Sequence, residues 1–338
     1  MSSGITYYRL ENNQVDGPKA GSASTVNRGF YGVPGVMEHL LINLKTNISA
    51  NANQTTDQTS LISQFRLIVN GEVVYDWTSG SAPAQGSALP GRFGYFINSI
   101  GGRFYQEPMG ADDKEANSWI GIPVGLILNA ATPRFEITIG YYDATLTLGT
   151  VAAPPTLTTE VSYWARFNTA TQVSTRVLSA TSFVHAANAI EQVVARVPSL
   201  TGSNNTVLGV FVQDDKESDD LGTQGIRSLA LSQFGMPISL QRWANGEMNN
   251  GVAWTNPAAS ISSQTYASYR RGALMLPLYG LNAGDITLLV DNGALGTTRL
   301  YSPVITSPLA GTKPKEPKQT IRAPGNNARK VIQRTETN

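Results

Sequence analysis

Cysteine is absent from this chain of 338 residues, and histidine occurs only twice, as His39 and His185. Without cysteine there is no disulfide framework, no thiol nucleophile and no zinc–thiolate site. Two histidines are too few for a histidine-based metal centre unless carboxylates complete it. These absences exclude the commonest thiol and zinc chemistries.

Charge is also scarce. Charged residues make up 14% of the chain, where a typical globular protein has about a quarter. The hydrophobic content of 41% is too high for a disordered chain. No hydrophobic run approaches the roughly twenty residues needed to span a bilayer, and residues 1–25 lack the apolar core of a signal peptide. The composition is typical of a folded protein whose surface is largely covered by neighbours.

Catalytic motifs are missing as well. The sequence contains no HExxH, GxSxG, GxGxxG or P-loop pattern. The acidic segment Asp214–Asp220 lacks both the central glycine and the closing glutamate of a calcium loop, because Gly222 comes late. A solvated loop is therefore favoured there over a cation site. We expect no enzyme activity and no cofactor.

What the sequence does contain is a series of strand patterns, the clearest of which lies in residues 40–77. Phe65, Leu67 and Val69 alternate with other residues up to Asn70-Gly71, after which an apolar run returns to Trp77. Asn-Gly between two β-rich runs is a strong hairpin signal, because both residues tolerate the positive φ of a type I′ turn.

The hairpin recurs in residues 226–243, where Gly235 and Trp243 correspond to Gly71 and Trp77. A second pair of similar blocks begins at Ile122 and Leu276. The offsets are 164 residues for the matched glycines and 154 residues for the matched prolines of the second pair, in the same order along the chain. Two copies of a β module of roughly 150 residues are therefore predicted.

Further elements are expected between these blocks. We expect short helices or strands within residues 78–120, a short helix followed by a strand in Ser182–Val197, and an edge or bend at Pro303. Residues 1–34 are interpreted as an extended arm. Strands are predicted at Ile122–Leu128, Arg134–Tyr142, Glu160–Phe167 and residues 205–213.

The C-terminal tail carries most of the basic character. Residues 311–338 have a net charge of +5, which leaves −4 for the rest of the chain. Prolines keep the first half of the tail extended, and its cations would attract nucleic acid phosphate or anionic lipid. A merely solubilising terminus is the alternative. The candidate site residues are Lys313, Lys315, Lys318, Arg322, Arg329, Lys330 and Arg334.

The strand-to-hairpin block Leu40–Trp77 and the later block Leu276–Gly293 resemble the double-jelly-roll major capsid proteins of tailless icosahedral viruses of the adenovirus–tectivirus lineage. The resemblance implies an all-β fold of two tandem eight-stranded antiparallel jelly rolls, with long loops and extended terminal arms. The expected divisions are an N-terminal arm (1–34), a first jelly roll (35–175), a second jelly roll (176–308) and a basic tail (309–338).

The same resemblance implies a structural role in the virion shell. Three copies would form a pseudo-hexagonal capsomer, assembled with neighbouring capsomers and with penton or minor capsid proteins. The protein would be made in the host cell cytoplasm. The tail would meet the lipid headgroups of an internal membrane first and the viral genome second.

Two other classes of function remain open at this point. One is a carbohydrate-binding, lectin-like pair of β-sandwiches or a receptor-binding spike, in which Trp77, Trp119, Trp243 and Trp254 stack on sugars. The other is a glycoside-acting enzyme, although no spacing in the sequence brings two carboxylates to the required separation.

Overall fold

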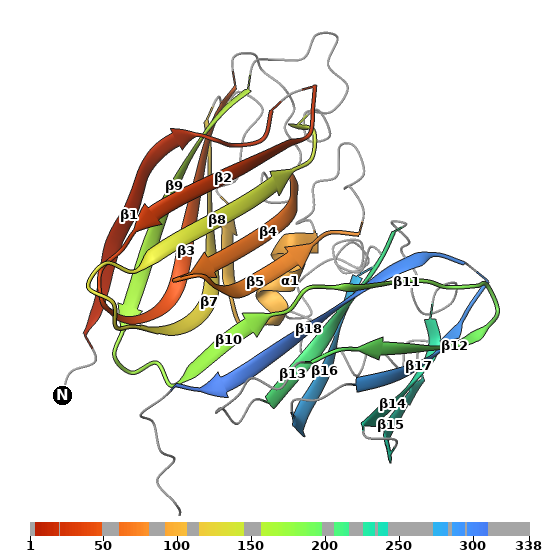
Figure 1. The fold of residues 1–338 in the computed structure, drawn as a ribbon. Coiled ribbons are helices and arrows are strands. Elements are labelled where there is room, and N and C mark those ends of the chain that lie inside the picture. The colour runs from red at the N-terminus through yellow and green to blue at the C-terminus, as the bar shows by residue number, and fades with distance from the viewer. Residues whose placement is uncertain are drawn as a thin grey trace, which may run out of the picture.

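The computed structural model describes most of the chain and forms an all-β molecule with eighteen strands and one helix in the described residues (Figure 1). The described residues contain no helix that is long and apolar enough to cross a membrane. The structure describes residues 4–19, 21–48, 61–80, 92–106, 115–144, 157–197, 206–215, 226–233, 236–242, 273–282, 286–294 and 296–309.

Two facing sheets make the first module. One sheet has the order β1-β9-β3-β7-β6, and the other runs β2-β8-β4-β5 within a larger sheet. The first sheet consists of β1 (Ile5–Val15), β9 (Leu157–Asn168), β3 (Gly35–Ile48), β7 (Glu115–Leu128) and β6 (Arg103–Gln106). The second consists of β2 (Ser24–Tyr31), β8 (Arg134–Tyr141), β4 (Ile62–Val69) and β5 (Glu72–Thr78).

The second module repeats this plan. Strands β10 and β11 both pair with β18, which is followed by β13 and β16, while the facing sheet has the order β12-β17-β14-β15. The first of these sheets contains β10 (Val173–Val177), β11 (Thr181–Val184), β18 (Thr298–Pro308), β13 (Thr206–Asp214) and β16 (Ala273–Asn282). The second contains β12 (Ile190–Ala195), β17 (Ile286–Asn292), β14 (Ile226–Gln233) and β15 (Met236–Arg242).

The two strand orders are equivalent position by position. The order β1-β9-β3-β7 matches β10/β11-β18-β13-β16, and β2-β8-β4-β5 matches β12-β17-β14-β15. The hairpins β4–β5 and β14–β15 thus occupy the same place in their modules, as do the pairs β7–β8 and β16–β17. The predicted duplication and the double-jelly-roll architecture are confirmed.

Local sequence explains the best-predicted hairpin. Phe65, Leu67 and Val69 alternate inward and are buried, which places the apolar face of β4 in the core. Asn70 and Gly71 have φ values of 51° and 83°, the left-handed conformation that an Asn-Gly turn provides at little cost. The predicted strands in β7, β8, β9 and β13 are confirmed, as are a helix, α1 (Arg92–Ser99), and a strand, β6, within residues 78–120.

Two expectations about regular structure were wrong. Residues 1–34 are not an arm, because β1 pairs with β9 and β2 pairs with β8 inside the first module. In Ser182–Val197 the expected helix is absent, whereas the expected strand is present as β12. The apolar residues there alternate with period two: Val193 and Ala195 are buried while Ile190 and Val194 are exposed. A turn with Asn188 at a φ of 53° separates β11 from β12.

Pro303 occupies an inner strand of the sheet and not an edge. It lies opposite Val210 of β13 on one side. On its other side the neighbouring strand is interrupted between β10 and β11, where Leu178 N donates to Pro303 O at 3.0 Å. Proline has no N–H to donate, and Pro303 lies at the gap between β10 and β11, where the neighbouring strand offers no regular hydrogen-bond partner for one.

Candidate functional site: the junction of the two modules

The two modules are joined by one sheet. Strand β5 of the first module runs parallel to β10 of the second, with Tyr75 opposite Val177, so one sheet is continuous from β16 to β2. An ion pair between Arg176 and Glu72 lies beside this contact. Ser179 donates a hydrogen bond to Asp76 on the same border. The junction combines main-chain pairing with side-chain contacts.

The backbones of β7 and β10 also approach closely. Gly125 has a φ of +57°, and a Cβ added there would lie 1.8 Å from the oxygen of Val173. Ser174 Oγ donates to the oxygen of Val124 at 3.4 Å, and the buried Tyr75 hydroxyl donates to the oxygen of Pro123. Only glycine fits at position 125, because any side chain there would prevent the close approach of the β7 and β10 backbones.

Helix α1 fills the space behind the junction with aromatic rings. Trp77 of β5 lies 4.9 Å from Phe93 and 5.7 Å from Phe96, measured between ring centroids. Phe211 of β13 lies 5.0 Å from Phe96 and 5.7 Å from Tyr95. Residues of both modules therefore share one hydrophobic core, while a second core lies within the second module.

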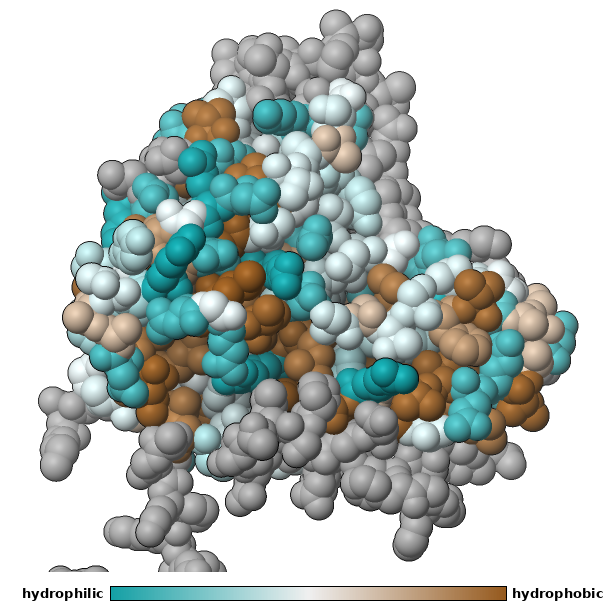
Figure 2. All heavy atoms as spheres, viewed as in Figure 1, coloured by the Kyte–Doolittle hydropathy of each residue, from teal (hydrophilic) through white to brown (hydrophobic). Residues whose placement is uncertain are grey.

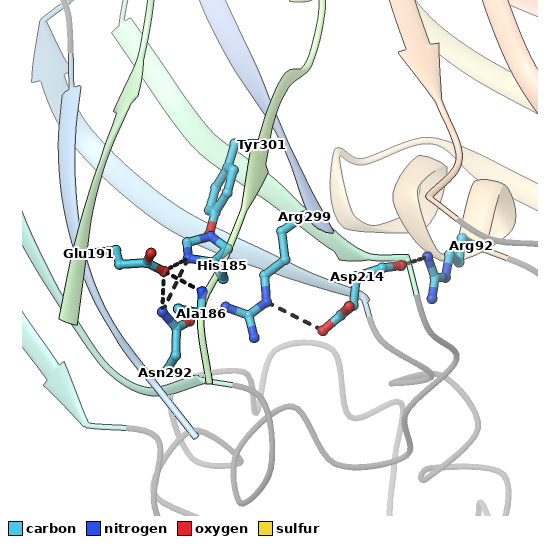
Figure 3. A network of polar contacts seen from close by, with 8 residues as sticks. All are labelled: Arg92, His185, Ala186, Glu191, Asp214, Asn292, Arg299 and Tyr301. Carbon is cyan, nitrogen blue, oxygen red and sulfur yellow. Dashed lines mark hydrogen bonds and ion pairs between the residues drawn. The ribbon is translucent and has the colours of Figure 1, made fainter. Parts of the chain in front are cut away.

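A polar network lies next to this core (Figure 3). Arg299 of β18 and Asp214 of β13 form an ion pair of 3.3 Å between Nε and Oδ2, with side-chain exposures of 0% and 1%. Arg299 also donates through Nη1 to Asn292. Arg92 of α1 donates to the main-chain oxygen of Asp214. The network thus connects the second module to the helix of the first.

His185 extends the network to the segment between β11 and β12. Its Nδ1 lies 2.9 Å from Glu191 Oε2, and its Nε2 lies 2.6 Å from the Tyr301 hydroxyl. Because a carboxylate only accepts, Nδ1 of the neutral ring donates to Glu191 and Nε2 accepts from Tyr301. Asn292 Nδ2 donates to the same Glu191 oxygen at 2.9 Å, and Ala186 N donates to it at 3.0 Å.

The electrostatics keep this ring neutral. Burial lowers the pKa of His185, and the positive charge of Arg299 lowers it further, while Glu191 acts in the opposite direction. Burial raises the pKa of the Tyr301 hydroxyl above its ordinary value. These groups hold β11, β12, β17 and β18 together. Among the described residues, no three His, Asp or Glu side chains are grouped so as to hold a metal ion.

The structure changes the interpretation of several sequence candidates. Asp214 is not part of a solvated acidic loop, because it ends β13 and is buried against Arg299. Trp77 is fully buried and therefore cannot stack on a sugar, whereas Trp119 is partly buried, with its ring 6.5 Å from that of Trp164. Trp243, Trp254 and the seven basic tail residues, Lys313, Lys315, Lys318, Arg322, Arg329, Lys330 and Arg334, lie outside the described residues.

Sequence reasoning missed the network altogether. Its members come from α1, β12, β13, β17 and β18 and from the segment after β11, and no local spacing relates them. The one available signal was the scarcity of charged residues and histidines. In a chain with 14% charged residues and two histidines, a histidine within a strand-rich apolar segment such as Phe183–Val197 requires a polar partner in the interior.

Comparison with known proteins found no match in sequence and several similar structures. No protein family model matches the chain, and no curated protein is similar to it in sequence. The atomic structure of Sulfolobus Turreted Icosahedral Virus contains a chain with 12% identity and a TM-score of 0.52, covering 90% of each chain. This likeness concerns the fold alone.

Two further structures are similar at lower scores. The crystal structure of the STIV MCP has 12% identity and a TM-score of 0.48, covering 90% of this chain and 96% of its own. The major capsid protein of bacteriophage PM2 has 10% identity and a TM-score of 0.44, covering 91% and 99%. The strand orders agree with the likeness to the chain of Sulfolobus Turreted Icosahedral Virus, whose TM-score is 0.52. This chain has the double-jelly-roll fold.

Proposed function

We propose that this protein is a major capsid protein, three copies of which form a pseudo-hexagonal capsomer of an icosahedral virion shell. The observation that carries this proposal is the fusion of two topologically equivalent jelly rolls through one sheet and one shared core. A fused pair of equivalent modules turns a ring of six into a closed assembly of three chains. The role is structural and not enzymatic.

The repeated strand order supports a proposed division of the chain. We place the boundary between the modules in residues 169–172, after β9 ends at Asn168 and before β10 begins at Val173. The first jelly roll includes β1 and β2, and the second extends to β18. The tail follows Leu309, whose N–H donates to the oxygen of Gln172 at 2.9 Å.

The tail is proposed as the inward-facing contact of the shell. Its net charge of +5 opposes the −4 of the remaining chain, so a basic arm would offset repulsion between the body and a polyanionic surface. We propose that it meets lipid headgroups of an internal membrane first and the genome second. Neighbouring capsomers and penton or minor capsid proteins would be the other partners.

Purified protein tests the assembly directly. Light scattering at increasing concentration should give a mass three times the 36.2 kDa of one chain, and negative-stain microscopy should show tiles with threefold symmetry and a nearly sixfold outline. A species that stays monomeric at high concentration under several salt conditions would overturn the proposal.

A further inference from the structure

We propose that β15 of one copy meets β1 of the next copy, and that this contact repeats between chains the β5–β10 contact that joins the modules within a chain. This inference rests on the proposed trimer, because it assigns the surfaces by which the trimer closes.

Both strands are sheet edges in the described part of the chain. Strand β1 pairs only with β9, and β15 pairs only with β14. The two edges lie at opposite ends of the molecule (Figure 1). An edge strand presents unpaired N–H and C=O groups that another chain can meet. Contacts between opposite ends join copies head to tail, the arrangement that can close into a ring.

The repeated topology identifies these two edges as complementary. Strand β5 is the last strand of β2-β8-β4-β5 in the first module, and β15 is the last strand of β12-β17-β14-β15 in the second. Strands β10 and β11 hold the position in the second module that β1 holds in the first. Within one chain, the β5 edge is already paired with β10. The matching pair that remains consists of β15 and β1, which are too far apart in one molecule to meet.

The strand register gives the expected position of the contact. Strand β10 begins with Val173 opposite Pro308 of β18, and β1 begins with Ile5 opposite Asn168 of β9. Counting from these starts, Arg9 takes the place of Val177, which faces Tyr75 in the internal junction. Tyr8 correspondingly takes the place of Arg176.

The side chains of β1 suit an interface. Ile5, Tyr7 and Tyr8, near the start of this edge strand, are 48%, 57% and 41% exposed. Tyrosine is enriched in protein interfaces because it buries a large ring and keeps a polar tip. The internal junction is likewise bordered by the exposed Val73 and Val173. Figure 2 shows hydrophobic residues gathered in the lower middle of the view, where Figure 1 draws β5 and β10.

Pairwise cross-linking tests the assignment, because the chain has no cysteine of its own. Tyr8→Cys is combined with Ile238→Cys, Ser239→Cys or Leu240→Cys, and each protein is treated with a short bis-maleimide. At least one pair should give covalent dimers and trimers on a denaturing gel, at tenfold or more the yield of either single variant. The internal standard is Glu72→Cys with Arg176→Cys, which should cross-link within one chain.

A matched control uses β12, which lies at the opposite end of its sheet from β15. Ile190 of β12 is 67% exposed, and Tyr8→Cys with Ile190→Cys should give no trimer above the single-variant level. If light scattering shows trimers but no β1–β15 pair cross-links, this inference is wrong while the proposed function stands. If the unmodified protein forms no trimer, the proposed function itself fails.

A charge variant gives a second readout. Tyr7→Lys with Tyr8→Lys should weaken trimer formation at least tenfold, because the interface would bury two cations, whereas Val184→Lys, at a residue 73% exposed on β11, should leave it unchanged. Equal effects of both changes, or an effect of Val184→Lys alone, would contradict the assignment.

Discussion

Arg299 and Asp214 form an ion pair in which neither side chain is exposed to solvent. Removing one partner deprives the other buried charge of this ion pair, which costs about 3–5 kcal/mol. We expect Arg299→Met to lower the free energy of unfolding by this amount in urea denaturation. Arg299→Met combined with Asp214→Leu should recover much of the loss, since no charge is then left unpaired. A double variant no more stable than the single one would show that the pair is not the source of the effect.

Acid should destabilise the second module through His185. Its pKa is lowered in the folded protein by burial and by Arg299, so the unfolded chain binds more protons below about pH 6.5. Stability is therefore complete above that pH and is lost as pH falls toward the folded pKa. His185→Gln should flatten the dependence of unfolding free energy on pH between 5 and 7. Part of the slope should remain, because burial lowers the pKa of His39 as well.

Gly125 should tolerate no side chain. In Gly125→Ala the new Cβ would lie 1.8 Å from Val173 O, at a φ of +57°, and we expect a loss of about 3 kcal/mol or more. Thermal unfolding measures it. Gly29→Ala is the matched control, because its Cβ would meet only Phe135 O at 3.8 Å. Similar losses in both proteins would contradict the proposed close approach of β7 and β10.

Phe211 should contribute to the stability of both modules. Its ring contacts Tyr95 and Phe96 of α1, so Phe211→Ala leaves a cavity at the junction and should cost about 3–5 kcal/mol. Hydrogen exchange should then rise in α1 as well as in β13. Faster exchange confined to β13 would mean that the helix does not depend on this contact.

Deletion of residues 311–338 should remove polyanion binding and leave trimers intact. The tail carries seven cations, each worth about 1 kcal/mol near an anionic membrane. Vesicles of phosphatidylserine should bind the full chain, with affinity that falls as salt rises, and should bind the truncated chain weakly with little salt dependence. Replacing Lys313, Lys315 and Lys318 by arginine should preserve binding, since in the proposed role the cations would act as interchangeable charges. Equal salt dependence of both chains would exclude this role.

The sequence predicted the elements in which local pattern and turn chemistry agree. Asn70-Gly71 specified its hairpin because few other residues accept that conformation, and the recurrence of the unit at Gly235 indicated the duplication. The N-terminal strands were missed because they alternate weakly and carry polar residues such as Asn12 and Asn13. Residues 182–197 fit periods of both two and about 3.6, and pairing with β17 and β18 decided between them.

The junction and its network had no comparable signal. Arg92, Asp214 and Arg299 are separated by 85 residues or more, so only the tertiary fold brings them together. Asp214 begins an acidic run in the sequence, and that context favoured solvent over burial. In a chain with few charged residues, each charged residue lies either at the surface or in a specific buried pair. Such residues are therefore candidates for the interior.

The continuous sheet also determines how the subunit bears force. The path from β16 to β2 narrows to a single residue pair between Tyr75 and Val177, whereas β13 and β18 are joined along eight pairs. Tension that pulls the two modules apart therefore acts on one residue pair of the sheet. Shear between the modules is resisted by the packed rings of Trp77, Phe96 and Phe211. Compression instead presses these close-packed rings together, and protein interiors are hardly compressible. If the chain forms the proposed shell, we expect that shell to resist inward load more than stretching, because stretching acts on the single-pair contact between the modules.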